Sequence, residues 1–548
     1  MSDDAIALAL FTHRFGHLVD DMGAVLAHTA LSTNVRDRLD FSCALLDRDG
    51  RLVVNAPHIP VHLGALGPCV RRVAAHLALR PGDVVVTNHP GFGGSHLPDV
   101  TVITPVWAAS ADGDPEDEAG DSAMLLGYVA SRAHHAEIGG VRPGSMPPGA
   151  RVLAEEGVVL PPIFLARGGV ARWSAIEQRL REGPWPSRAV ADNLADLRAQ
   201  VAANRRGAVG LRRLAIEHGP VVVADAMASL RAQAAARMMT ALGVRAPGTQ
   251  RATQRLDDGT PLAVAITVAH DAAPGPDGRP RGRATIDLRG SGGVHPGNRN
   301  APFAVVRSAV LYALRLLIDA PLPLNEGLLD PVALIAPEGV LNPPFDGPPA
   351  QLPAVVAGNV ETSQRVVDLL LRALRLSACS QGTMNSVLFG TDHFGYYETV
   401  CGGTGAGPGF RGASGVHSHM TNTRITDPEV LETRYPVRLE RFALRRGSGG
   451  AGRGRGGDGN ERGRQFGAPV AVSLLSEHRV EAPYGVDGGA PGARGRQRLV
   501  RADGSVEPLG GDASIEVAAG DRLWLETPGG GGWGAPIADA DDGAGSRP

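Results

Sequence analysis

The chain of 548 residues contains no lysine, so all 54 basic residues are arginines. A nucleotide-binding loop of the Walker type needs a lysine on the phosphates, and Schiff-base or pyridoxal chemistry needs a lysine amine. Both kinds of site are therefore excluded within these residues. A GC-rich genome is the simplest cause of the arginine bias, and the chemical exclusion holds whatever its origin.

Cysteine is also scarce. The four cysteines, Cys43, Cys69, Cys379 and Cys401, form no CxxC pair. Their spacing argues against a structural zinc site, a redox pair or a secreted disulfide framework. Isolated cysteines are usually small buried hydrophobic residues, and a cysteine nucleophile is the alternative.

Long apolar runs and an excess of one charge are missing as well. No run approaches the roughly 18 residues that span a bilayer, and the net charge is only −3. Neither a nucleic-acid partner nor an anionic membrane is expected. The N-terminus, Met1–Asp4, is acidic where a secretory signal would be basic, so we expect a cytoplasmic protein.

What is present favours a large, loop-rich globular chain, with 43% hydrophobic residues, 73 glycines and 42 prolines. Periodicity predicts helices over 3–30, 187–242, 301–317 and 363–376, and strands over 40–46, 84–86, 100–106, 124–131 and 284–290, with a strand pair in 248–283. We expect an α+β fold of several mixed layers. Its predicted regions are an N-terminal α/β region (1–245) with the helical segment 187–242, a central α+β region (246–440), a glycine-rich β region (441–536) and a disordered tail (537–548).

Three other segments have distinctive compositions. The acidic segment 110–122 is most simply a surface loop. In 187–242, Asp192, Asp196, Gln200 and Asn204 recur every four residues, which indicates either a solvated stripe or a helix face that lines a site or an interface. The arginine- and glycine-rich segment 445–464 lacks interleaved aromatic residues, so β-turns are favoured over RNA binding.

Two clusters could bind a metal. His96 and Asp99 lie three apart in a glycine-rich loop before a predicted strand, and His134, His135 and Glu137 follow the next strand. If the two strands are neighbours, mixed imidazole and carboxylate ligands could converge on Zn, Mn or Fe(II). For any one of these histidines, an ordinary hydrogen-bonded role is the alternative. The reserve candidates are His58, His62, His417 and His419.

Seven collinear runs resemble the hydantoinase B/oxoprolinase family over nearly the whole chain, residues 30–536. They are NAPHIPVHLGAL (55–66), NHPGFGGSHLPDVTVITPV (88–106), SRAHHAEIGGVRPGSMPPG (131–149), DNLADLRAQVAANRRG (192–207), VHSHMTNTRITDPEVLETRYPV (416–437), RRGSGGAGRGRGGDG (445–459) and TPGGGGWG (527–534). Within the family, the resemblance is to the C-terminal half of ATP-dependent oxoprolinases.

The resemblance implies one component of a hetero-oligomeric hydrolase for cyclic amides. A hydantoinase A-like ATPase subunit would bind ATP and Mg and phosphorylate the lactam oxygen of 5-oxo-L-proline. This chain would then complete ring opening to L-glutamate with water activated by a divalent metal. Another cyclic amide such as an N-methylhydantoin, a carboxylase-type reaction on the same scaffold, and a non-catalytic scaffold subunit are the alternatives.

Site residues follow from the resemblance by motif. The implied metal ligands are Asp40, His96, Asp99 and His134. His135 and Glu137 are the expected catalytic residues that orient or deprotonate water. Arg424 is the expected residue that binds a carboxylate or phosphate of the substrate. The alternative role for Arg424 is an ion pair with Asp427 or Glu432.

The chain departs from the family pattern at two positions. Glu137 replaces the usual aspartate, which puts a ligand role there in doubt, and Arg411 replaces a histidine that could affect specificity.

Overall fold

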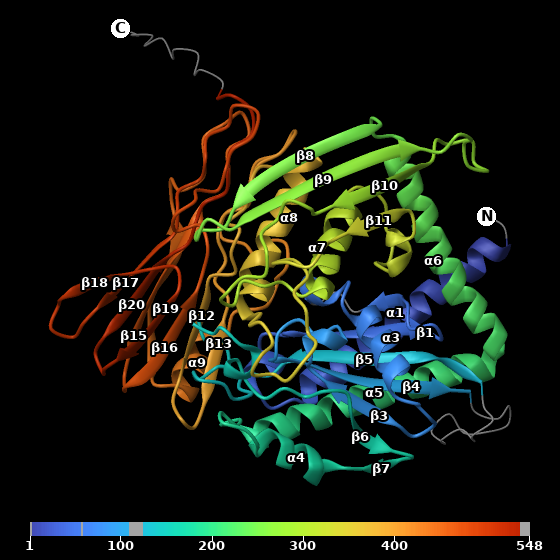
Figure 1. The fold of residues 1–548 in the computed structure, drawn as a ribbon, viewed down its shortest axis with the longest axis horizontal. Coiled ribbons are helices and arrows are strands. Elements are labelled where there is room, and N and C mark those ends of the chain that lie inside the picture. Colours follow the sequence, from blue (N-terminus) through green and yellow to red (C-terminus); the bar gives the residue numbers. More distant parts are fainter. Residues whose placement is uncertain (1–2, 56–58, 109–123, 537–548) are drawn as a thin grey trace, which may run out of the picture.

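The computed structural model describes residues 3–55, 59–108 and 124–536 (Figure 1). The acidic segment 110–122, His58 and the tail 537–548 lie outside the described residues. The described chain contains several sheets and long helices, which confirms the expected α+β fold of mixed layers.

A seven-stranded antiparallel sheet forms the N-terminal layer, with strand order β2-β1-β5-β4-β3-β6-β7. Its strands are β1 (Phe41–Asp47), β2 (Leu52–Asn55), β3 (Val84–Thr87), β4 (Asp99–Trp107), β5 (Leu125–His134), β6 (Ile163–Arg167) and β7 (Val170–Ala171). Both faces are buried, because alternate β1 residues enter different cores: Cys43 and Leu45 pack with α1 and α5, whereas Ala44 and Leu46 pack with α3.

The helices on these faces come from distant parts of the sequence. They are α1 (Asp3–Thr29), α2 (Thr33–Arg36), α3 (Leu66–His76), α4 (Trp173–Arg181), α5 (Val190–His218) and α6 (Pro220–Gly243). Short 3-10 turns, η1 (Pro60–His62), η2 (Pro90–Phe92) and η3 (Leu153–Glu155), connect the strands. The predicted helix over 187–242 is thus two helices, divided where Gly219 adopts a φ of +87° before Pro220.

The polar stripe of α5 is an interface with the sheet. Gln200 Nε2 donates to the carbonyls of Val100 (3.0 Å) and Ser131 (3.2 Å), and Asn204 Nδ2 donates to that of Val102 (3.0 Å). Three of the four stripe residues are buried, and Asp192 alone is exposed. Amide side chains here satisfy main-chain groups of the sheet, which is the interface alternative of the sequence analysis.

A second layer carries the largest hydrophobic core. Its sheet has the order β11-β10-β9-β8, from β8 (Gly248–Arg255), β9 (Pro261–His270), β10 (Gly282–Asp287) and β11 (Val332–Ile335). Packed against it are α6, α7 (Phe303–Arg315) and α8 (Ser363–Ala373), with η4 (Glu326–Leu329) and the π-helical turn η5 (Gly358–Thr362), which runs directly into α8. These elements confirm the helices predicted over 301–317 and 363–376.

Two antiparallel sheets form a sandwich around one core at the side of the molecule that is orange and red in Figure 1. One contains β12 (Ser386–Gly390), β13 (Gly395–Glu398), β16 (Val470–Leu475) and β19 (Ala513–Val517). The other contains β14 (Val437–Arg445), β15 (Gly459–Phe466), β17 (Arg496–Val500), β18 (Val506–Leu509) and β20 (Arg522–Glu526), and α9 (Pro428–Arg434) packs beside them. The sandwich therefore includes strands that precede residue 441.

Glycine-rich segments near the sandwich lie side by side at main-chain hydrogen-bonding distance. The N–H of Gly457 donates to Thr404 O, and that of Gly530 donates to Gly457 O, both at 2.9 Å. A Cβ atom on Gly530 would overlap Thr404 O, and one on Gly403 would overlap Gly457 O. Close approach of backbones, in addition to turns, thus explains the glycine content of 445–464.

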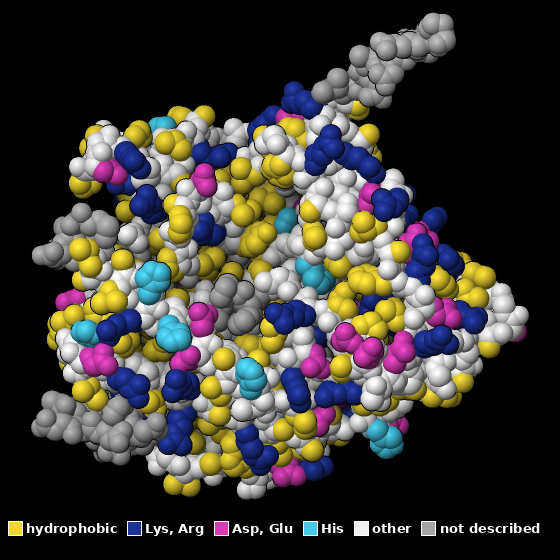
Figure 2. Space-filling view, turned by 180° about the vertical axis from the view of Figure 1, so that it is seen from behind, with side chains coloured by type: hydrophobic (Ala, Val, Ile, Leu, Met, Phe, Trp, Pro, Cys, Tyr) yellow, Lys and Arg dark blue, Asp and Glu magenta, His cyan; other side chains and the backbone are white. Residues whose placement is uncertain are grey.

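Two surface properties complete the description. Arginine and carboxylate side chains are interspersed over the face shown in Figure 2. Within the described ranges, no helix is both long and apolar enough to cross a bilayer.

Candidate metal centre

Three adjacent strands bring the predicted metal ligands together. Asp99 begins β4 and His134 ends β5, and the two residues are directly paired in the antiparallel register. Asp40 immediately precedes β1 on the other side of β5, and its carbonyl accepts a hydrogen bond from His134 N–H at 2.9 Å. Directly opposed residues project from the same face, so strand pairing alone places Asp99 next to His134.

The loop before β4 adds His96. Asn88 holds this loop, because its Nδ2 donates to Leu97 O at 2.8 Å and its Oδ1 accepts from Leu160 N–H at 2.7 Å. Gly93 has a φ of +85°, and a Cβ there would lie 2.7 Å from Cys69 N, so only glycine fits. The motif that the sequence analysis singled out is therefore a rigid loop.

Three donor atoms converge in this centre. His96 Nε2 lies 3.3 Å from Asp99 Oδ1, His134 Nδ1 lies 3.4 Å from the same oxygen, and the two imidazole nitrogens are 3.2 Å apart. His62, a reserve candidate, joins them, with Nε2 3.2 Å from Asp99 Oδ2. Asp40 is at the edge, 4.0 Å from His134 Nδ1. The four central residues are each at most 2% exposed.

Burial and neighbouring charges shift two groups of the centre. Burial would raise the pKa of Asp99, but His96 and His62, with a hydrogen bond from His134, hold that pKa well below its usual range. Burial lowers the pKa of His134, which disfavours its charged form. The buried Asp99 carboxylate therefore stays ionised and is available as a ligand.

Two polar atoms beside the centre lack a hydrogen-bond partner within the described part of the chain. His134 Nε2 and Asn359 Oδ1 are buried without a hydrogen-bond partner among the described residues. Asn359 Nδ2 lies 3.3 Å from His96 Nδ1. An amide rotated by 180° would let Asn359 Oδ1 accept the Nδ1 proton of His96, which leaves the Nε2 lone pair free for a ligand bond.

His135 and Glu137 are not brought into the centre. Successive strand residues point to opposite faces, and His135 faces α5, where its nitrogens lie 3.1 Å from Asn193 Nδ2 and 3.2 Å from Gln200 Oε1. Glu137 is buried, accepts the N–H of Gly144 at 2.8 Å and pairs with Arg188 at 3.2 Å. Both side chains are occupied in holding the segment that follows β5.

The remaining candidates lie elsewhere. The Arg424 side chain is exposed and makes no hydrogen bond or ion pair within the described ranges, while Asp427 caps α9 and Glu432 accepts Leu439 N–H. His417 is partly buried, and desolvation of its ring together with Arg38 lowers its pKa to about 4. His419 contacts Asp368 at 2.9 Å.

Sequence reasoning missed three neighbours of the centre. The Tyr397 ring stacks on the His134 ring, with centroids 4.7 Å apart. The Arg38 guanidinium lies over the Tyr397 ring, 4.8 Å from its centroid. Asn359 contacts His96. Arg38 also donates to Tyr397 O at 2.5 Å. None of the three belongs to a spacing pattern that would indicate a metal, and only the fold reveals them.

Comparison with known proteins decides the family. Residues 4–536 match the Hydantoinase B/oxoprolinase family. The chain belongs to this family. It is 44% identical to 5-oxoprolinase 1 of Arabidopsis thaliana and 42% identical to the 5-oxoprolinase of Saccharomyces cerevisiae, in each case over 97% of this chain and 42% of the relative.

The fold of this family member recurs in a solved structure. The ATP-dependent caprolactamase from Pseudomonas jessenii superposes with a TM-score of 0.84 at 24% identity, covering 98% of this chain and 93% of that one. The chain spans about two fifths of the length of the two oxoprolinases.

Proposed function

We propose that this chain is the hydrolytic, B-type part of a 5-oxoprolinase, which opens 5-oxo-L-proline to L-glutamate at the expense of ATP. The observation that carries the proposal is the buried convergence of His96, Asp99 and His134 in a chain that is 44% identical to a 5-oxoprolinase over 97% of its length. An unstrained lactam resists hydrolysis through amide resonance, and phosphorylation of its oxygen removes that resonance.

His96, Asp99 and His134 would hold a divalent metal of the Zn, Mn or Fe type, with Asp40 and His62 beside them. Such an ion supplies Lewis acidity to the carbonyl and to water. The chain's own residues prepare the site: Asp99 carries the negative charge, and Asn359 fixes the orientation of His96.

Other residues position the site or the substrate. His135 and Glu137 hold the end of β5 through Asn193, Gln200 and Arg188, so we assign them positioning roles. Arg424 remains the candidate for the substrate carboxylate, and its exposed, unpaired guanidinium supports this role within the described part of the chain.

We place the ATP-dependent step outside these 548 residues. Without lysine the chain cannot form a Walker site, and the relatives contain a further stretch of more than half their length. We propose that a hydantoinase A-like ATPase, as a partner subunit, binds ATP and Mg and phosphorylates the lactam.

A reconstitution experiment tests this division. The purified chain alone should produce no glutamate from 5-oxo-L-proline and ATP, and adding the ATPase component should start production. Parallel assays of glutamate and phosphate would follow both steps. ATP turnover by the isolated chain would contradict the division, and glutamate production that does not depend on the chain's metal would contradict the proposed centre.

A further inference from the structure

A second cluster of potential ligands lies in a different part of the fold. Asp368 of α8, Cys379 of the following loop and His478 after β16 each offer a donor atom, and these atoms all lie within 4.8 Å of one another. All three residues are buried, with exposures of 1%, 0% and 0%. The cluster is distinct from the first centre, because Asn359, which contacts His96, precedes Asp368 by nine residues, or about 13 Å of helix.

The Cys379–His478 pair has the geometry of two ligands on one ion. Cys379 Sγ lies 3.4 Å from His478 Nε2. On a tetrahedral zinc, a sulfur at about 2.3 Å and a nitrogen at about 2.0 Å are about 3.5 Å apart. His478 Nδ1 donates to Glu481 O at 2.7 Å, so the Nε2 lone pair faces the cluster. A carbonyl behind a histidine is the usual arrangement for metal-binding imidazoles.

Asp368 provides an unsatisfied oxygen. Its Oδ1 accepts from Ser380 N–H and from His419 Nε2, both at 2.9 Å. Its Oδ2 is buried and has no hydrogen-bond partner among the described residues. A buried carboxylate oxygen without a partner is costly, and a cation shared with Cys379 and His478 would satisfy it.

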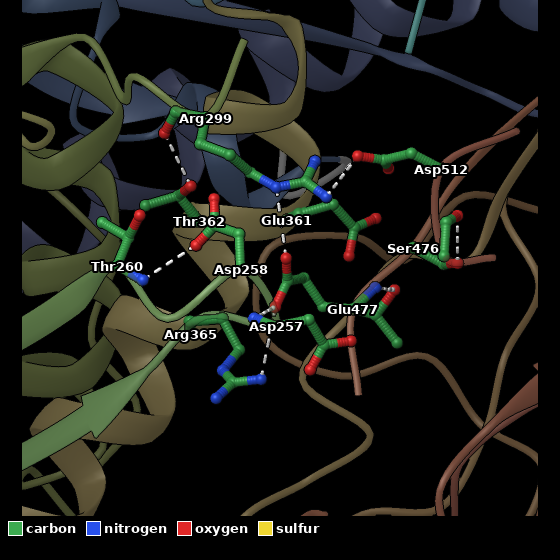
Figure 3. A network of polar contacts seen from close by, with 12 residues as sticks. Asp257, Asp258, Thr260, Arg299, Glu361, Thr362, Arg365, Ser476, Glu477 and Asp512 are labelled. Carbon is green, nitrogen blue, oxygen red and sulfur yellow. Dashed lines mark hydrogen bonds and ion pairs between the residues drawn. The ribbon is translucent and has the colours of Figure 1, made fainter. Parts of the chain in front are cut away.

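The surrounding chain holds these groups rigidly. Glu477, next to His478, pairs with Arg299 at 3.1 Å and with Arg365 of α8 at 3.6 Å (Figure 3). His478 has a φ of +59°, a conformation that non-glycine residues seldom adopt without compensation. A Cβ on Gly382 would lie 2.5 Å from His478 Nε2, so glycine leaves the space that the imidazole occupies.

A thiol nucleophile fits this geometry poorly. Cys379 is fully buried, and the histidine's second nitrogen is bonded to a main-chain carbonyl, where a catalytic triad would place a carboxylate. Cysteine sulfur, histidine nitrogen and aspartate oxygen are instead all ligands that zinc accepts. We propose that Asp368, Cys379 and His478 form a second, buried site for a divalent cation of the zinc class, assembled from distant segments and therefore without the CxxC spacing that the sequence analysis looked for. It ties α8 and the loop after it to the C-terminal sandwich.

Cobalt substitution tests the site directly, because a thiolate bound to Co(II) has a charge-transfer absorption in the near ultraviolet. The first centre contains no cysteine, so this band reports only on Cys379. The full chain, stripped of metal and reloaded with Co(II), should show the band and bind about two equivalents of cobalt by elemental analysis. Absence of the band in the reloaded wild-type chain would overturn the proposal.

Variants separate the two sites. Cys379→Ser should lose the band and about one equivalent of cobalt, whereas His96→Ala should lose one equivalent and keep the band. Cys401→Ser is the matched control, because this cysteine is also buried but lies outside the cluster, where its Sγ accepts a hydrogen bond from Asn460 Nδ2. If Cys379→Ser does not fold, His478→Gln replaces it. A band that persists in Cys379→Ser, or in His478→Gln where that variant replaces it, would contradict the proposal without affecting the first centre.

Discussion

His96 lies in the glycine- and proline-rich loop before β4 and Asp99 is the first residue of that strand, and neither side chain belongs to an apolar core. Replacing either by alanine removes a ligand and opens no large hydrophobic cavity. We expect His96→Ala and Asp99→Ala to bind almost no metal in the first centre. Glutamate production should fall by orders of magnitude while the chain stays folded. Asp99→Ala should also lower the melting temperature, because it leaves three buried histidines without their carboxylate. Elemental analysis, calorimetry and the coupled assay would measure the three effects.

His135→Ala is the contrasting variant, since this residue is equally buried but faces α5. The change leaves Gln200 and Asn193 without their partner, which costs roughly 1–3 kcal/mol of stability. Metal content should stay at the wild-type level. Loss of metal without loss of stability in His135→Ala, or retained metal in Asp99→Ala, would contradict the assignment.

At the residue scale, the sequence predicts what local spacing encodes. His96, Asp99 and His134 stand in recognisable motifs, and the structure brings them together, with His62 added from the reserve candidates. Asn359, 263 positions after His96, could not be predicted, because an asparagine in a helical segment has no distinctive pattern. The same applies to Cys379 and His478, 99 positions apart.

The turn η3 and the segment before η5 are joined through Glu156. Its Oε1 accepts the N–H groups of Val355 and Val356 at 2.9 and 2.8 Å, and its Oε2 is buried without a partner among the described residues. Burial raises the pKa of Glu156 to about 8. The folded chain therefore holds a proton on this carboxyl group that the unfolded chain releases above its ordinary value of 4.5.

The sign of the pH effect follows from that difference. Between about pH 5 and 8 the folded state binds more protons than the unfolded state, so Glu156 lowers the unfolding free energy as the pH rises, by up to about 1.4 kcal/mol per unit. Glu156→Gln keeps the acceptor and cannot ionise. Denaturant unfolding should show it equal to wild type near pH 5 and more stable at pH 8. Glu177→Gln, on the surface of α4, should follow the wild-type profile; an unchanged pH slope in Glu156→Gln would contradict the argument.

The strands β4 and β5 should pair without the acidic segment between them. Their register continues to Trp107 opposite Leu125, and Ala108 N–H donates to Met124 O at 2.8 Å. Replacing residues 110–122 by a turn of about two to four residues should leave the melting temperature and activity nearly unchanged. The control is a second variant in which the same turn replaces residues 274–279, between β9 and β10. A large loss of activity with an unchanged melting temperature would show that the acidic segment is an interface.

At the element scale, periodicity predicts the long helices because each has an apolar face of helical spacing, as in α1 and α7. Periodicity does not predict the order of the strands in a sheet. The sheet places β5 between β1 and β4, and β12 pairs with β16 about 85 residues later. Such pairings depend on packing between distant segments, which one sequence does not encode locally.

Main-chain hydrogen bonds between distant glycine-rich segments help to hold the whole molecule together. Glycine-rich segments around residues 403–412, 449–457 and 529–534 approach so closely that their main chains exchange hydrogen bonds where side chains would otherwise stand. From composition alone these segments are typical of turns. Their long-range role emerges only when the fold brings segments more than 100 residues apart into contact.

Gly530→Ala tests this role. The added methyl group would overlap Thr404 O, a main-chain atom that cannot move aside alone, so overpacking should cost at least about 1–3 kcal/mol and lower the melting temperature. Gly467→Ala is the matched control in the same part of the chain, because its Cβ would lie at an ordinary 3.5 Å from Pro436 O. Thermal unfolding of both variants measures the difference. Equal melting temperatures would mean that the glycine-rich segments tolerate side chains and that the sandwich is stabilised by its apolar core alone.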